Sequence, residues 1–228
     1  MATTDPSAAS ADAAAPVDAE ILVIVAHPEL EQSRANRRLL QSARELEGRS
    51  PRGRLAVRDL YALYPDYLID IAVEQAALKA AKLVVWQQPI RWYSMPPLLK
   101  LWLDDVLTFG WAYGPDGNAL RGKDLWLVAS TGGPEDSYRP ESYNRYFFDA
   151  FLPPYEQTAA LCGMRFLPPL ILHGAHKASE AELAAHAETY AQRLADYPAW
   201  PEIDLVEDCV ECAVPPSARP ADRVMATA

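Results

Sequence analysis

The stretch Ile21-Leu22-Val23-Ile24-Val25-Ala26-His27-Pro28 is the part of the chain that says most about its fold. Its five consecutive aliphatic residues predict a strand that is buried on both faces, as in a parallel sheet. Shortly afterwards, Ser33-Arg34-Ala35-Asn36 opens an amphipathic helix, with Ser33 in a suitable N-cap position. The first turn of a helix has free N–H groups and carries the positive end of the helix dipole. This junction is therefore expected to bind an anionic group such as a phosphate.

The pattern Ala26-His27-Pro28 after a first strand also resembles zinc-dependent deacetylases that act on sugar amides. The segment His173-Gly174-Ala175-His176 could supply further ligands. In that family two acidic residues follow the proline and the second binds zinc, whereas here Glu29 is followed by Leu30, which cannot coordinate a metal. The deacetylase stays a lower alternative, and we expect no metal site.

Composition narrows the class of protein. The 228 residues are 50% hydrophobic, enough for one full core, and the net charge of −10 disfavours binding to nucleic acid. Residues 1–19 resemble neither a signal peptide nor a packed segment, and three cysteines do not form a disulfide framework. We expect a disordered leader over 1–19, a domain over 20–197, an acidic, proline-containing tail over 198–228 and a cytoplasmic location. Cys209 and Cys212 lie in the tail and are expected to have no function.

Apolar runs that alternate with helical patterns predict an α/β fold with a doubly wound parallel sheet and helices on both faces. The five expected strands are Ile21–Val25, Leu55–Val57, Leu83–Trp86, Leu125–Ser130 and Phe166–Leu172. Pro168-Pro169 indicates that the last strand is an edge strand. Helices are expected from Ser33 to a stop at Gly48, from Pro97 to Val106, and from Ser179 to Leu194.

The chain lacks the G-x-G-x-x-G pattern of a dinucleotide-binding Rossmann domain, which favours strand order 2-1-3-4-5. Three loops would then meet at the carboxyl ends of neighbouring strands. The first has donors for a phosphate, the second has backbone amides and aromatic surface for a flat ring, and the third has glycines that allow close approach to the ring edge. A flavin mononucleotide would fit all three. The expected cofactor-binding residues are His27, Ser33, Arg34, Ala35, Asn36, Pro89, Ile90, Arg91, Trp92, Ser130, Thr131, Gly132 and Gly133.

Several segments in this order resemble the flavodoxin-like NAD(P)H:quinone oxidoreductases, and most closely their KefF-type members, the ancillary proteins of glutathione-gated potassium efflux. The segments that carry the resemblance are Ala26-His27-Pro28, Ser33-x-Ala35-Asn36, Trp86-Gln87-Gln88-Pro89, Trp92 to Lys100, Gly110 to Gly114 and Thr131-Gly132-Gly133. The resemblance covers roughly Ile21 to Leu194.

This resemblance implies a homodimer that binds FMN or FAD and reduces quinones by two-electron, ping-pong hydride transfer from NADH or NADPH. It places Tyr138 as a catalytic residue near the flavin, but the histidine that accompanies this tyrosine in larger members is replaced here by the Tyr143-Asn144 region. Arg91 stands where relatives usually have glutamine. An alternative from another class is a regulatory flavoprotein that binds a potassium-efflux transporter, which would bring the protein to the inner membrane surface.

Overall fold

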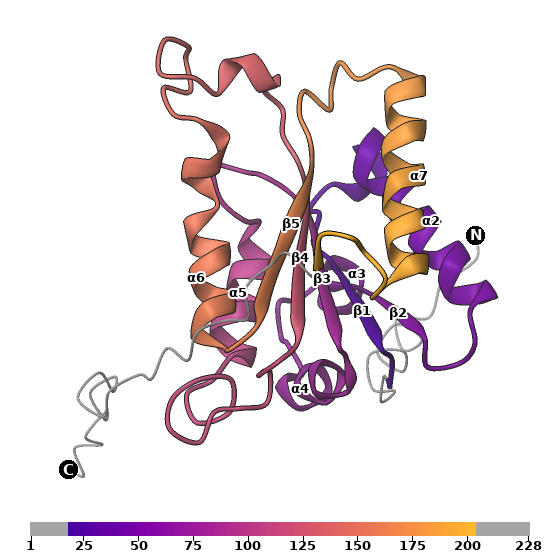
Figure 1. Cartoon of the computed structure of the whole chain (residues 1–228), viewed down its shortest axis with the longest axis vertical. Coiled ribbons are helices and arrows are strands. Elements are labelled where there is room, and N and C mark those ends of the chain that lie inside the picture. Colours follow the sequence, from indigo (N-terminus) through magenta and orange to yellow (C-terminus); the bar gives the residue numbers. More distant parts are fainter. Residues whose placement is uncertain (1–17, 204–228) are drawn as a thin grey trace.

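The computed structural model describes residues 18–203, and these form one α/β domain around a five-stranded parallel sheet (Figure 1). The strands follow the order β2-β1-β3-β4-β5, as predicted. Their bounds are β1 (Ile21–Val25), β2 (Leu55–Asp59), β3 (Leu83–Pro89), β4 (Asp124–Ser130) and β5 (Arg165–Leu172).

Helices cover both faces of the sheet (Figure 1). On one face lie α2 (Arg34–Arg49) and α7 (Glu180–Asp196), and on the other lie α4 (Ile71–Ala80), α5 (Pro97–Val106) and α6 (Pro153–Leu161). The short helix α3 (Leu60–Leu63) follows β2, and three 3₁₀ turns complete the elements: η1 (Leu30–Gln32), η2 (Glu135–Ser137) and η3 (Phe148–Phe151). Sequence reasoning had not named α3, α4 or α6.

Strand β1 shows why the sheet is covered on both sides. Leu22 and Ile24 pack into the core against α4 and α5, whereas Ile21, Val23 and Val25 pack into the core against α2 and α7. Side chains alternate between the two faces of a strand, so a run without polar residues requires two apolar layers.

The helix α2 begins as predicted and ends later than predicted. The Ser33 hydroxyl accepts a hydrogen bond from the Asn36 N–H (3.1 Å), which caps the helix. Gly48 does not end the helix: the helix continues through Gly48 to Arg49. Neighbouring helical residues override the local preference of a single glycine.

The packed part of the chain extends beyond the expected domain boundary at residue 197. Trp200 and Ile203, which the sequence assigned to the tail, are buried against the α2 and α7 side of the sheet. Trp200 packs edge-on against Trp126 of β4 with ring centroids 4.8 Å apart. The leader up to residue 17 and the tail from residue 204, with Cys209 and Cys212, lie outside the described residues.

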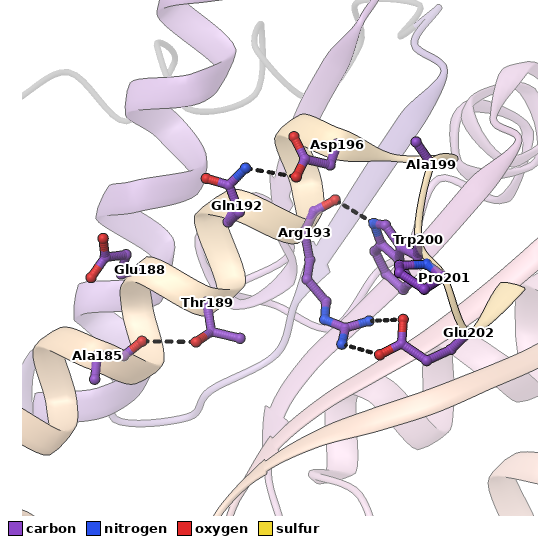
Figure 2. A pocket seen from close by; sticks show the side chains of 10 residues that line it. All are labelled: Ala185, Glu188, Thr189, Gln192, Arg193, Asp196, Ala199, Trp200, Pro201 and Glu202. Atoms are coloured by element: carbon purple, nitrogen blue, oxygen red, sulfur yellow. Dashed lines mark hydrogen bonds and ion pairs between the residues drawn. The ribbon is translucent and has the colours of Figure 1, made fainter.

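A hollow of about 540 Å³ lies between α7 and residues 199–202 (Figure 2). Its central groups bind one another: Arg193 forms two hydrogen bonds to Glu202 (2.7 and 3.1 Å), and Trp200 Nε1 donates to the Arg193 carbonyl (2.7 Å). These contacts fasten the segment after α7 to the helix, which gives the hollow a structural role. Within residues 18–203, no helix has the length and apolar character needed to cross a membrane.

Candidate functional site

The predicted loops meet at one edge of the sheet, because β1, β3 and β4 are neighbouring parallel strands and their carboxyl ends point the same way. The first loop connects β1 to α2, the second connects β3 to α5, and the third follows β4. Hydrogen bonds join them. Asn36 Nδ2 donates to Ser130 Oγ (2.8 Å), and the Ile90 N–H donates to the Ser130 carbonyl (2.8 Å).

His27 is almost fully buried at the end of β1. Its Nδ1 accepts a hydrogen bond from the Glu29 N–H (3.1 Å), so the neutral ring carries its proton on Nε2. Burial, followed by the nearby charge of Arg91, lowers the pKa of His27 to about 4. At neutral pH, His27 is therefore an uncharged donor at the start of the first loop.

Asn36 is held firmly in the first turn of α2. The residue is 1% exposed, and its backbone carbonyl accepts a hydrogen bond from Gln87 Nε2 (3.0 Å). Gln87 is held in turn, because its Oε1 accepts from the Tyr190 hydroxyl (2.9 Å). Asn36 Oδ1, by contrast, is buried without a partner. A buried acceptor without a partner is uncommon and indicates a place where a further donor can bind.

Arg34 is the predicted site residue whose side chain turns away. Its guanidinium donates to the Ala178 carbonyl (2.9 Å) and to Glu180 (2.6 Å) at the start of α7. Only its backbone N–H, in the first turn of α2, remains close to the site. Ala35 is buried beside it and leaves room in the same turn.

The second loop contains a strained turn. Arg91 and Ser94 exchange two backbone hydrogen bonds (2.9 and 3.0 Å), and the residues between them, Trp92 and Tyr93, have φ of 49° and 63°. Positive φ at two successive bulky residues costs free energy and is concentrated at functional sites. The Trp92 side chain is 92% exposed. The Arg91 guanidinium forms an ion pair with Glu29 of the first loop.

The third loop is closed by its own threonine. The Thr131 hydroxyl donates to the Gly133 carbonyl (2.7 Å), and Thr131 itself is buried. A Cβ on Gly133 would lie 2.7 Å from Ser137 Oγ and 2.9 Å from the Tyr143 hydroxyl, so any larger residue would displace these two side chains. At Gly132 a Cβ would lie 3.3 Å from His176.

A cleft of about 210 Å³ opens between the second and third loops. Its lining residues are Ile90, Trp92, Tyr93, Gly133, Tyr138, Tyr143 and Asn144. Tyr93 bridges the two sides through its hydroxyl, which donates to Asn144 Oδ1 (3.2 Å). Burial raises the pKa of Tyr138, so its phenol stays protonated and can donate a hydrogen bond.

The sequence did not identify His173 and His176 as neighbours of this site; the pair was considered only as possible metal ligands of the deacetylase alternative. The structure places His173 Nδ1 3.1 Å from Thr131 Oγ1 and the His176 ring against Gly132. Their position along the chain could have indicated this proximity, because they directly follow the last strand, β5, which pairs with β4. Carboxyl ends of neighbouring strands meet, whatever the separation along the chain.

The residues present fit a flavin nucleotide. Backbone N–H groups of a capped helix start and the neutral His27 suit a phosphate, and the partnerless Asn36 Oδ1 suits a hydroxyl donor. Gly132 and Gly133 carry no side chains, so a ring edge can approach their backbone closely, and the exposed Trp92 offers a flat apolar surface. The flavin contacts of the individual residues remain predictions.

Residues 19–194 match a family model described as the flavodoxin-like fold. The chain belongs to the flavodoxin-like family. Among curated members, it is 48% identical over 177 residues to the glutathione-regulated potassium-efflux system ancillary protein KefF of Klebsiella aerogenes, covering 78% of this chain and 96% of that one. The KefF protein of Citrobacter koseri is 47% identical over 182 residues, covering 80% and 97%.

Solved flavodoxin-like structures resemble the chain as well. The general stress protein 14 of Treponema denticola, in complex with FMN, is 38% identical with a TM-score of 0.70, covering 77% of this chain and 98% of that one. An NADPH-quinone reductase of P. pentosaceus is 27% identical with a TM-score of 0.65, covering 77% and 97%. The family prediction is thereby confirmed.

Membership of the flavodoxin-like family argues against the zinc-dependent deacetylase alternative. Glu29 pairs with Arg91, and His173 contacts Thr131. The part of the chain from 18 to 203 contains no group of three His, Cys, Asp or Glu side chains that could share a metal ion. Together with membership of the flavodoxin-like family, these contacts favour a flavin site.

Proposed function

We propose that this protein is a flavin-dependent NAD(P)H:quinone oxidoreductase. The observation that carries the proposal is the convergence of a helix start, an aromatic turn and a glycine loop at the carboxyl ends of β1, β3 and β4. The FMN complex of the 38% identical relative supports FMN over FAD as the cofactor.

Each loop would hold a different part of the cofactor. His27, the Ser33 hydroxyl and the backbone N–H groups of Arg34 and Ala35 would bind the phosphate, and Asn36 Oδ1 would accept from the adjoining sugar alcohol. The ring system would lie along Pro89, Ile90, Arg91 and Trp92, with Ser130, Thr131, Gly132 and Gly133 at its opposite edge. Tyr138 would donate a hydrogen bond from its protonated phenol at that edge.

The bound flavin supplies two-electron hydride chemistry, and the protein supplies position and electrostatics. The cleft beside Trp92, Tyr138 and Tyr143 is small, at about 210 Å³. A nicotinamide and a quinone would therefore use the same space in turn, which is a ping-pong order. Tyr138 and Asn144 would orient both, and the aromatic wall would exclude water.

The helix-start role is tested with two matched caps. Ser33 and Ser179 both cap long helices through a hydroxyl that accepts from the residue three positions later (3.1 and 3.2 Å), but only Ser33 lies at the site. Ser33→Ala and Ser179→Ala should each cost about 1 kcal/mol of stability. Only Ser33→Ala should also weaken FMN binding, measured by quenching of flavin fluorescence. Equal FMN affinity in both variants would contradict the phosphate site.

Activity is tested by anaerobic spectroscopy of reconstituted protein. Yellow protein whose flavin absorbance is bleached by NADPH or NADH, and recovers on addition of a quinone, is expected. Steady-state rates should give parallel lines in double-reciprocal plots. Tyr138→Phe should slow one half-reaction without changing flavin content. Protein that cannot be reconstituted with FMN or FAD would contradict the proposal.

A second function, regulation of a potassium-efflux transporter, is favoured by the two KefF relatives. The two functions are compatible, since a flavoprotein can dock to a transporter at the membrane surface while keeping its cleft. Co-purification with the transporter encoded in the same organism, with and without FMN, tests this role. Quinone reduction with no effect on potassium efflux would leave only the enzymatic function.

A further inference from the structure

The side chain of Thr131 lies at the centre of a hydrogen-bonded group behind the cleft. Its hydroxyl donates its single hydrogen to the Gly133 carbonyl (2.7 Å). The oxygen also lies 3.1 Å from His173 Nδ1. Because the threonine hydrogen is already used, the hydrogen in the second contact must come from the imidazole. His173 is therefore held as the Nδ1–H form.

The segment that carries His173 is fastened to the third loop by its backbone. Thr131 N–H donates to the Leu172 carbonyl (2.9 Å), Gly174 N–H donates to the Gly133 carbonyl (2.8 Å), and Ala175 N–H donates to the Thr131 carbonyl (2.9 Å). Residues 172–175 thus run alongside residues 131–133. This arrangement fixes the position of the imidazole relative to the loop.

Tyr138 connects this group to the cleft. Its ring lies against His173 (centroids 5.4 Å apart) and against Phe148 (5.3 Å). Burial raises the pKa of Tyr138, so its phenol stays protonated beside this group. Tyr138 lines the cleft, so the His173 ring packs against a wall residue of the cleft.

We propose that His173 is a positioning residue, which acts through the Thr131 hydroxyl to hold the glycine loop in place for the flavin, while its ring packs against Tyr138. This inference rests on the proposed function. The imidazole N–H fixes the Thr131 rotamer, and that rotamer closes the loop at Gly133. His173 lines no part of the cleft and needs no contact with the reactants.

Two substitutions separate hydrogen bonding from packing. His173→Phe keeps a ring against Tyr138 and Phe148 but has no donor, whereas His173→Asn places an amide N–H near the Nδ1 position and has no ring. If His173 positions Thr131, the Phe variant should reduce its flavin with NADPH about fivefold to tenfold more slowly, and the Asn variant should stay within about twofold of wild type. His186→Phe on α7, away from the site, is the control.

A second measurement does not depend on activity. Nitrogen NMR of the histidine side chains in flavin-free protein should show His173 as the Nδ1–H tautomer, and this preference should be lost in Thr131→Val. Flavin affinity, measured by fluorescence quenching, should fall several-fold in His173→Phe and not in His173→Asn.

The outcomes separate this inference from the proposed function. If His173→Phe reduces its flavin as fast as wild type and His173→Asn reduces it more slowly, His173 acts through ring packing, and the inference is overturned. An Nε2–H tautomer in the flavin-free wild type would overturn it as well. Wild-type protein that binds no flavin would instead contradict the proposed function, and the tautomer measurement would still report on the Thr131 contact.

Discussion

At the scale of single residues, His27 is tuned by its surroundings. Burial removes water from the imidazole, and the positive charge of Arg91 further disfavours a second proton. The ring thus stays neutral beside a helix start, where it can donate to an anion without adding a titrating charge.

The lowered pKa of His27 predicts a pH-dependent loss of stability. The folded protein has a pKa of about 4 at this residue against 6.5 for the unfolded value, so the unfolded state binds the proton first as the pH falls. Stability should decrease from about pH 6.5 down to about pH 4, by up to roughly 3 kcal/mol from this residue. Urea unfolding of flavin-free protein at several pH values measures the decrease.

The matched variant for this prediction is His27→Gln, which cannot titrate. Its free energy of unfolding should depend less steeply on pH within the same window. Identical slopes for wild type and variant would show that His27 is not the responsible group.

Glu74 is a second residue whose environment determines its effect. It is fully buried, and its carboxylate accepts from Arg58 Nε (2.7 Å), the Tyr64 hydroxyl (2.6 Å) and Trp102 Nε1 (2.9 Å). Removing one member of such a group leaves a buried charge without a partner.

Glu74→Ala should therefore lower the free energy of unfolding by about 3–5 kcal/mol. The exposed ion pair between Lys100 and Asp104 serves as a control, and Asp104→Asn should have no measurable effect. Denaturant unfolding measures both. A small effect of Glu74→Ala would indicate that water enters and solvates Arg58.

At the scale of elements, the two ends of α2 differ: hydrogen bonds fix the first turn, whereas the last turn has room for substitution. Its first turn is fixed by Ser33, Asn36 and the contacts to Ser130, which serve the site. Its last turn passes through Gly48, which is exposed and has helical backbone geometry. A Cβ at Gly48 would meet no atom within 4 Å, so a larger residue has room there.

Gly48→Ala should stabilise the protein by about 0.5–1 kcal/mol, because alanine loses less backbone freedom in a helix. Gly114→Ala is the opposite case, since Gly114 has φ of 91° and a Cβ there would lie 2.6 Å from the Phe109 ring. Thermal unfolding should show a raised midpoint for the first variant and a lowered midpoint for the second. A lowered midpoint for Gly48→Ala would mean that the helix ends before Arg49 in solution.

At the scale of the whole molecule, the distribution of aromatic side chains points to assembly. The apolar helix α5 offers little surface to a second chain, because Leu98, Leu99 and Trp102 are buried in the core. The most exposed aromatics are Trp92 (92%) and Tyr143 (70%), which line the cleft, and Tyr146 (62%) and Phe147 (62%), which follow Tyr143 along the chain; these four residues are called the aromatic rim. Tyr93 and Tyr146 both contact Phe151, which connects the two sides of this rim.

We expect a two-fold dimer that buries this rim. Light scattering at micromolar concentration should give twice the mass of one chain. The double variant Tyr146→Ser with Phe147→Ser should weaken the dimer at least tenfold, measured by sedimentation. Leu68→Ser, at another exposed apolar position, is the comparison; a loss of dimer in that variant alone would place the interface near residues 67–71.

The order of the sheet could be predicted from the amino-acid sequence, because an uninterrupted aliphatic strand, the loop motifs and an edge strand marked by Pro168 and Pro169 leave few ways to arrange five parallel strands. The first loop could be placed in the same way, since a helix cap is a local feature that Ser33 and Asn36 complete within one turn.

The distant side chains that complete the site became visible only in the folded structure. Arg91 pairs with Glu29, Arg34 turns to α7, and His173 reaches Thr131 across 42 positions of sequence. Such contacts depend on strand register and side-chain direction, and these are fixed only when the sheet assembles and brings the carboxyl ends of β1, β3, β4 and β5 together.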